Sequence, residues 1–215
     1  MTDAKVDGRL ERGEHTRRLI LERAVDIAST NGLEGLSIGR LSSELAVSKS
    51  GVFAHFGSKE ELQLATLALA RDVFIEHVIT PALRARAGLT RLWELCEARL
   101  DYMAERVFPG GCFFSAAATE FDSRPGRVRD AIVASERDLL RFYEGIITVA
   151  IEQGELADDT DPALLAFELD ALTRTAGTSS MLFDDSVSFT MARKAILGRL
   201  RSAATDPSAL PKVPK

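Results

Sequence analysis

The chain lacks the long apolar runs of a membrane or exported protein. Its longest stretch without a charged residue spans 13 residues, Val107 to Thr119, and includes one proline and two glycines. A helix that crosses a bilayer needs about 20 mostly apolar residues, so no membrane span and no membrane partner are expected. The first 14 residues have no apolar core of the kind found in secretory signals. These absences predict a cytoplasmic protein.

Cysteine and histidine are scarce, which argues against several kinds of site. Two cysteines, Cys96 and Cys112, cannot build the disulfide framework of a small secreted domain. Di-iron bundles need a glutamate three residues before a histidine, but the residues three before the chain's histidines are Arg12, Val52 and Phe74. Phosphate-binding loops, zinc-protease motifs and nucleophile elbows are also missing. We therefore expect no catalytic residue, metal or cofactor, and a helical-bundle enzyme is the less favoured alternative.

The chain has no excess of basic residues. It contains 27 Lys and Arg against 32 Asp and Glu, a net charge of −5. Residues 1–60 carry nine basic and nine acidic residues, so the acidic excess belongs to the remainder of the chain. Bulk charge therefore gives no support to a nucleic-acid partner. Any DNA-binding site must come from the local placement of a few side chains.

What the sequence does contain is helical periodicity throughout, without the alternation that marks strands. This pattern predicts an all-α protein of about nine helices. The expected helices cover residues 15–30, 37–45, 48–55, 58–81, 89–107, 112–121, 125–153, 162–183 and 187–202. Residues 1–14 are expected to form a flexible arm, and residues 205–215 a loose tail with three prolines.

Two of these helices have the spacing of a helix-turn-helix. Ser37 can cap the first and Ser48 the second, and only a few residues separate them. An eight-residue helix is marginal alone, so tertiary contacts through Val52 and Phe56 must hold the second one. The second helix of such a pair can lie in the major groove of DNA. The pattern thus predicts a DNA-reading element at residues 48–55.

The outward side chains of this element are suited to DNA. They are Ser48, Lys49, Ser50, Phe53 and His55. Lysine and serine can bind phosphates or base edges. Lys59 begins the next helix, whose free N–H groups favour a phosphate. Each residue also has a plain structural interpretation, with Ser48 as a simple N-cap, Lys49 on a solvated face and Phe53 in the core.

The run GLEGLSIGRLSSELAVSKSGVFAHFGSKEEL, residues 32–62, resembles the DNA-binding region of the TetR (tetracycline-repressor) family. The preceding HTRRLILERAVDIASTNG is similar to the first helix of that family. The resemblance implies that Thr16 and Ser37 contact phosphates and that His55 can donate to one. The family commonly has a tyrosine at the position of Phe53 and uses its hydroxyl group on a phosphate. The ring of Phe53 has no hydroxyl group, so it can make only van der Waals contact with a sugar or a thymine methyl.

The resemblance also implies an organisation and a function. It implies a DNA-binding domain over residues 15–60 and a helical ligand-binding and dimerisation domain over residues 61–204. The implied function is a ligand-responsive repressor that binds a palindromic operator as a homodimer and is released by a small, mostly apolar effector. Two reading helices related by a twofold axis would contact half-sites roughly 34–36 Å apart. A helical ligand-binding dimer without DNA binding is the alternative.

Family analogy places the dimer interface on the helices near residues 162–183 and 187–202. The stripes expected there are Leu165, Leu169, Leu172 and Ala176 on the first helix and Phe189, Ala192, Ile196 and Leu200 on the second. These stripes could instead face the chain's own core.

Aromatic and sulfur-containing residues are candidates for the effector site. They are Trp93, Cys96, Met103, Phe113, Phe114 and Phe142. Apolar walls with a few polar groups are typical of small-ligand sites. A glycine break at Gly110–Gly111 would leave room for a cavity near this set. Heptad-spaced residues of this kind can also be core alone.

Overall fold

A computed structural model describes residues 3–211 of the chain, with side chains from residue 13 onward. The helices are α1 (Asp3–Asn31), α2 (Ile38–Leu45), α3 (Lys49–Phe56), α4 (Lys59–Phe74), α5 (Thr80–Arg84), α6 (Leu89–Ala104), α7 (Phe113–Phe121), α8 (Arg127–Glu152), α9 (Pro162–Phe183) and α10 (Val187–Ala203). A π-helical turn, η1 (Ile75–Ile79), joins α4 to α5 in one rod. No strand occurs within residues 3–211, where one isolated bridge links Leu156 and Ala204. The all-α prediction is confirmed.

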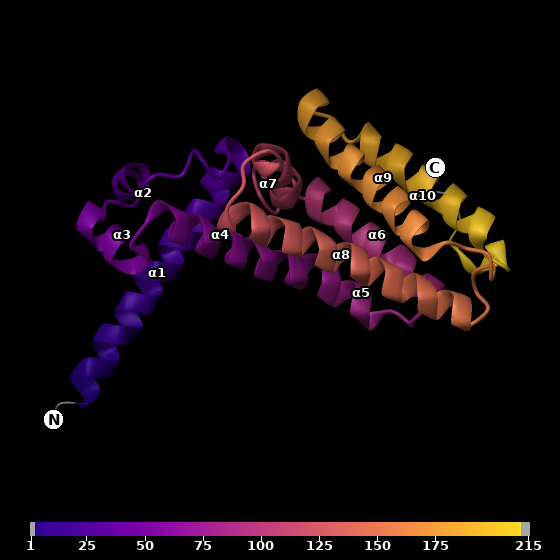
Figure 1. Cartoon of the computed structure of the whole chain (residues 1–215), viewed down its shortest axis with the longest axis horizontal. Helices are drawn as coiled ribbons and strands as arrows, with labels where there is room; N and C mark the ends of the chain where they lie inside the picture. Colours follow the sequence, from indigo (N-terminus) through magenta and orange to yellow (C-terminus); the bar gives the residue numbers. More distant parts are fainter. Residues whose placement is uncertain (1–2, 212–215) are drawn as a thin grey trace.

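The helices form a small lobe and a larger bundle (Figure 1). Helices α1, α2 and α3 gather at one end, and the N-terminal part of α1 projects away from them. Helices α6, α8, α9 and α10 run along the bundle, and α4 extends from the lobe into it. Among the described helices, none is long and apolar enough to cross a bilayer.

Apolar contacts and serine caps hold the short helices of the lobe. Val52 is fully buried and Phe56 is 7% exposed, as their spacing predicts. Oγ of Ser37 accepts a hydrogen bond from the backbone N–H of Arg40 at 3.1 Å, and Oγ of Ser48 accepts from that of Gly51 at 3.0 Å. Each cap satisfies an N–H group that the helix itself leaves without an acceptor.

The expected flexible arm over residues 1–14 differs from the structure, in which α1 begins at Asp3. Residues 9–12 are Arg, Leu, Glu and Arg, which favour helix strongly enough to offset the glycines at 8 and 13. Residues 1–2 lie outside the described part. The helix expected to stop at Pro81 also continues, and Pro81 lies at the start of α5 directly after the π-helical turn η1.

The expected loose tail over residues 205–215 is packed as far as the structure describes it. The backbone N–H of Thr205 donates to the carbonyl of Glu155 at 3.0 Å. Leu210 is 6% exposed and belongs to the apolar core. Apolar burial and backbone pairing thus hold this segment despite its prolines. Residues 212–215 lie outside the described residues.

A close backbone approach joins the lobe to the bundle. The backbone N–H of Gly110, in the loop before α7, donates to Oγ of Ser29 near the end of α1 at 3.1 Å. A Cβ at residue 110 would overlap the carbonyl group of Ser29. Glycine is therefore required there by contact rather than by backbone conformation.

We expect Gly110→Ala to lower the free energy of unfolding by about 1–3 kcal/mol, since overpacking against a backbone group forces the chains apart. Gly145→Ala on α8 is the matched control, because a Cβ there meets no atom within 4 Å. The control should be neutral or stabilising by up to about 1 kcal/mol, the difference in helix propensity. Urea unfolding of both variants measures these values, and equal stability of the two would contradict the close approach.

Candidate DNA-binding surface and effector pocket

Helix α3 presents the residues predicted to read DNA at the surface of the lobe. Ser48, Lys49 and Ser50 at its start are exposed, and Phe53 is 55% exposed. His55 is half-buried. The core interpretation of Phe53 is therefore wrong, whereas Ser48 does act as an N-cap. A serine that caps a helix can still offer its hydroxyl to a phosphate.

Lys49 is a cation with room to reach a partner. A Cβ added at Gly39 on α2 would lie 3.7 Å from Cε of Lys49, so the glycine leaves space for the lysine stem. Within residues 13–211 no acidic side chain pairs with Lys49. Its charge is thus not neutralised locally.

The other predicted contacts surround α3. Thr16 is half-buried on α1, and Ser37 is exposed at the start of α2. Nζ of Lys59 donates to the backbone carbonyl of Glu34 at 2.8 Å and to its carboxylate at 2.9 Å. The hydrogen bond from Lys59 lowers the pKa of Glu34. A phosphate contact by Lys59 would have to compete with this pair.

Several acidic side chains of the lobe are also paired. Glu44 accepts from Nε of Arg40 at 2.9 Å and from Nε of Arg23 at 2.5 Å, so it joins α2 to α1. These two hydrogen bonds lower the pKa of Glu44. The guanidinium of Arg17 lies 5.3 Å from the ring centroid of Phe56. Glu34 and Glu44, which would repel DNA, are therefore each held by basic partners.

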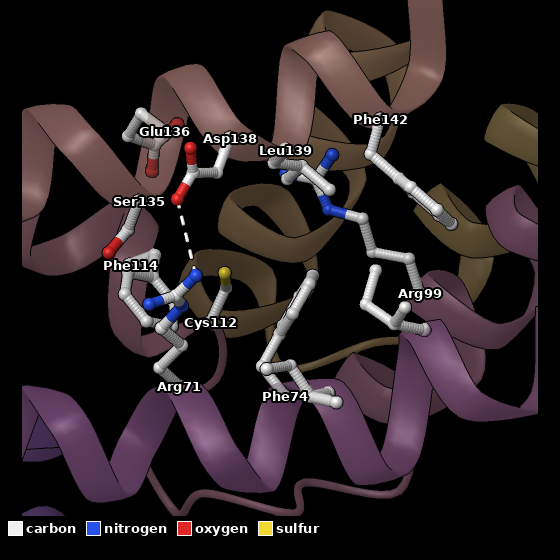
Figure 2. A pocket seen from close by; sticks show the side chains of 12 residues that line it. Arg71, Phe74, Arg99, Cys112, Phe114, Ser135, Glu136, Asp138, Leu139 and Phe142 are labelled. Carbon is white, nitrogen blue, oxygen red and sulfur yellow. Dashed lines mark hydrogen bonds and ion pairs between the residues drawn. The ribbon is translucent and has the colours of Figure 1, made fainter. Parts of the chain in front are cut away.

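A cavity of about 190 Å³ lies in the bundle (Figure 2). Its lining residues are Arg71, Phe74, Ile75, Ile79, Arg99, Cys112, Phe114, Ser135, Glu136, Asp138, Leu139 and Phe142. Figure 2 shows Arg71 of α4 reaching across to Asp138 of α8, and the two form an ion pair at 3.2 Å. Of the six predicted effector residues, Phe114 and Phe142 line this cavity.

The other four predicted effector residues lie outside this cavity. Cys96 and Phe113 are buried in the core at 0% and 2% exposure. Met103 packs its sulfur against Gly177 on α9, and Trp93 lines a separate hollow near the C-terminal end. The heptad pattern identified buried faces correctly, but a buried face need not border a cavity.

Arg99 and Glu136 of the cavity wall belong to a cluster of paired charges. Arg99 is 1% exposed, and its Nη1 donates to Oδ1 of Asp170 at 2.6 Å. Arg174 pairs with the same carboxylate at 3.2 Å and also with Glu136. Burial alone would raise the pKa of Asp170, but Arg99 and Arg174 bring it below its ordinary value. Together, Arg99, Glu136, Asp170 and Arg174 form a charge network.

Sequence reasoning missed Arg99 as part of this wall, although a signal was present. Arg99 lies three residues after Cys96 and four before Met103, inside the apolar stripe of its helix. A charged residue at a buried position is rarely there without a partner or a role. Ser135, three residues after Ile132 and four before Leu139, carries the same signal, and so does Arg71, four residues after Leu67 and three before Phe74.

Two family models match the chain. The model described as "Bacterial regulatory proteins, tetR family" matches residues 20–66. The model described as "Tetracyclin repressor-like, C-terminal domain" matches residues 88–196, slightly more than half of the chain. The first match contains α2 and α3, and the second contains most of the bundle.

Individual proteins are similar along most of their length. The HTH-type transcriptional regulator SrpR of Pseudomonas putida is 26% identical over 149 residues, which cover 69% of this chain and 67% of SrpR. A TetR transcriptional regulator from Chloroflexus aurantiacus has a TM-score of 0.85 at 19% identity, covering 90% of this chain and 98% of its own. AibR, solved with isovaleryl coenzyme A and operator DNA, has a TM-score of 0.64 at 23% identity, covering 75% and 85%.

In the native protein we expect a small thiol reagent to modify Cys112 and to spare Cys96. The thiolate is the reactive form, and burial raises the pKa of Cys96 to about 12, whereas Cys112 lines the cavity. Mass spectrometry after reaction at about pH 8, near the ordinary thiol pKa, counts the modified residues. Cys112→Ser should remove the native reaction, and denaturant should expose both thiols. Equal rates at the two cysteines would contradict this arrangement.

Proposed function

We propose that this chain, which belongs to the TetR family of bacterial regulators, is a ligand-responsive repressor that acts in the cytoplasm. In this proposal it binds a palindromic operator as a homodimer and leaves the DNA when a small, mostly apolar effector enters the bundle. Members of the family are transcriptional regulators rather than enzymes. The observation that carries the proposal is the exposed, serine-capped start of α3, joined through α4 to a bundle with its own cavity.

The charge distribution of the lobe supports DNA contact at α3. Lys49 lacks an acidic partner in the described part of the chain, while Glu34 and Glu44 are engaged by basic side chains. The phosphate backbone supplies most of non-specific affinity, so a single free cation beside small polar groups is significant. Phe53 adds an exposed ring that can meet a sugar or a thymine methyl.

Exposed apolar side chains on α9 and α10 support a homodimer. They differ from the stripes that the sequence predicts for the interface. The predicted stripes, with Leu172 half-buried and the rest buried, pack into the chain's own core. The opposite surface is also apolar, with exposed Leu164, Phe167, Leu182, Phe183, Val187 and Met191. Helices α9 and α10 lie side by side along one edge of the bundle (Figure 1). A large exposed apolar patch of this kind marks an interaction site.

Helix α7 connects the cavity with the lobe. Phe114 in its first turn lines the cavity. Glu120 near its end accepts hydrogen bonds from the backbone N–H groups of Leu33 at 2.7 Å and Glu34 at 2.9 Å. A ligand that displaces α7 would therefore also move the loop between α1 and α2. Such a ligand acts as an effector only if it binds the state with displaced α7 more tightly than the state that binds DNA. AibR holds both an acyl coenzyme A and operator DNA on a similar fold.

DNA binding is tested with fragments selected from a genomic pool and followed by fluorescence anisotropy at several salt concentrations. We expect Lys49→Ala to weaken binding and to reduce the salt slope by about two per dimer, one for each lost phosphate contact. Arg84→Ala is the matched control, because it removes one exposed positive charge at the end of α5, far from α3. The absence of any salt-dependent binding would instead favour a ligand-binding dimer without a DNA function.

The dimer is tested by sedimentation equilibrium of Phe167→Glu and Met191→Glu. Each replaces a side chain that is more than 60% exposed, so the monomer fold should persist. We expect the dimer dissociation constant to rise about thirtyfold or more, the effect of removing a hot-spot residue worth about 2 kcal/mol. Leu83→Glu, at an exposed position on α5, is the control and should leave the constant unchanged. An unchanged constant in both test variants would place the interface elsewhere.

A further inference from the structure

The wall of the cavity contains a buried hydrogen-bond donor without an acceptor. Arg99 lines the cavity, and its Nε has no partner among the described residues although it is shielded from solvent. Its Nη1 is already engaged by Asp170. A buried donor left unsatisfied costs about 1–3 kcal/mol. A ligand that supplied an acceptor to this N–H group would recover that free energy.

The charges around Arg99 are already balanced. The charge network contains two guanidinium groups, from Arg99 and Arg174, and two carboxylates, from Glu136 and Asp170. A ligand carboxylate beside Arg99 would add a negative charge to this neutral network, and Arg71, the other basic residue of the cavity wall, is itself paired with Asp138. Such uncompensated buried charge is strongly unfavourable. The structure therefore favours an acceptor that carries no charge.

Apart from Arg71, Ser135 and Asp138, the rest of the cavity wall is apolar, and the cavity is small. Phe74 and Phe114 meet edge to face with centroids 5.9 Å apart, and Leu139 and Phe142 face them from α8 (Figure 2). The volume of about 190 Å³ lies below the roughly 300 Å³ at which drug-sized sites begin. These walls suit a compact molecule on the scale of one aromatic ring.

We propose that the effector is a compact, neutral, mostly apolar molecule with one carbonyl-type oxygen, which accepts a hydrogen bond from Nε of Arg99. The inference rests on the proposed function, because it names the ligand class of the same regulatory pocket. A pure hydrocarbon would leave the donor unsatisfied, and a carboxylate would unbalance the charge network.

Three probes of nearly equal shape separate these possibilities. Acetophenone offers a neutral carbonyl, α-methylstyrene replaces its oxygen with carbon, and benzoate carries a charge. Titration calorimetry with the full chain is expected to give acetophenone a dissociation constant at least about tenfold below those of the other two, which corresponds to one satisfied hydrogen bond. Equal or tighter binding of α-methylstyrene or benzoate overturns the proposal, as does the absence of binding by all three.

Two variants test whether the preference for the ketone arises at Arg99 in this cavity. Arg99→Lys keeps a positive charge beside Asp170 but removes Nε, so acetophenone should lose its tenfold advantage while α-methylstyrene is unchanged. Leu139→Trp fills the cavity and should abolish binding of every probe. Persistent binding in Leu139→Trp, or a persistent ketone preference in folded Arg99→Lys, overturns the proposal. If circular dichroism shows that Arg99→Lys is unfolded, the wild-type comparison of the three probes still decides.

Operator binding is measured in the same samples to separate the two proposals. A ketone preference in a protein that binds no DNA contradicts the repressor function and leaves the ligand class supported. DNA binding in a protein without a ketone preference contradicts the ligand class and leaves the repressor function supported.

Discussion

The carboxylate of Glu120 joins the bundle to the lobe, beside the rod that begins with α4 and the contact of Gly110 with Ser29. It accepts from two successive backbone N–H groups, at Leu33 and Glu34, just beyond the end of α1. Gly32 permits this approach for two reasons, because its φ is +78° and because a Cβ there would lie 2.7 Å from the carboxylate oxygens. A charged acceptor with two backbone donors is among the stronger hydrogen-bonding arrangements. The same helix lines the cavity through Phe114, so the cavity and the lobe share one short helix.

In the lobe, local pairing of charges leaves a basic side chain on α3 without an acidic partner, although the sequence there is neutral. Nine basic and nine acidic residues in residues 1–60 give no net attraction to phosphate. The fold commits Glu44 to two arginines and Glu34 to Lys59. Lys49 is left with no acidic partner in the described structure. Net charge is thus a poor guide to binding when acids and bases are sorted onto different surfaces.

The parts of the fold that could be predicted are those set by local chemistry. Serine caps and the spacing of Val52 and Phe56 determine α2 and α3, and the sequence shows both features directly. The cavity depends on where helices fail to pack closely, which no single helix encodes. Cys96 and Phe113 therefore had the expected character but the wrong location. On α9 and α10 both faces are apolar, so periodicity alone could not say which face the core would take.

The charge network has a consequence for how this pocket can evolve or be redesigned. Its members belong to three helices, with Arg99 on α6, Glu136 on α8, and Asp170 and Arg174 on α9. Replacing one member alone strands a buried charge, whereas replacing a whole set with well-packed apolar residues is often tolerated. A change in the charges of this wall therefore requires concerted exchange on helices that are distant in sequence, which libraries of single substitutions do not sample.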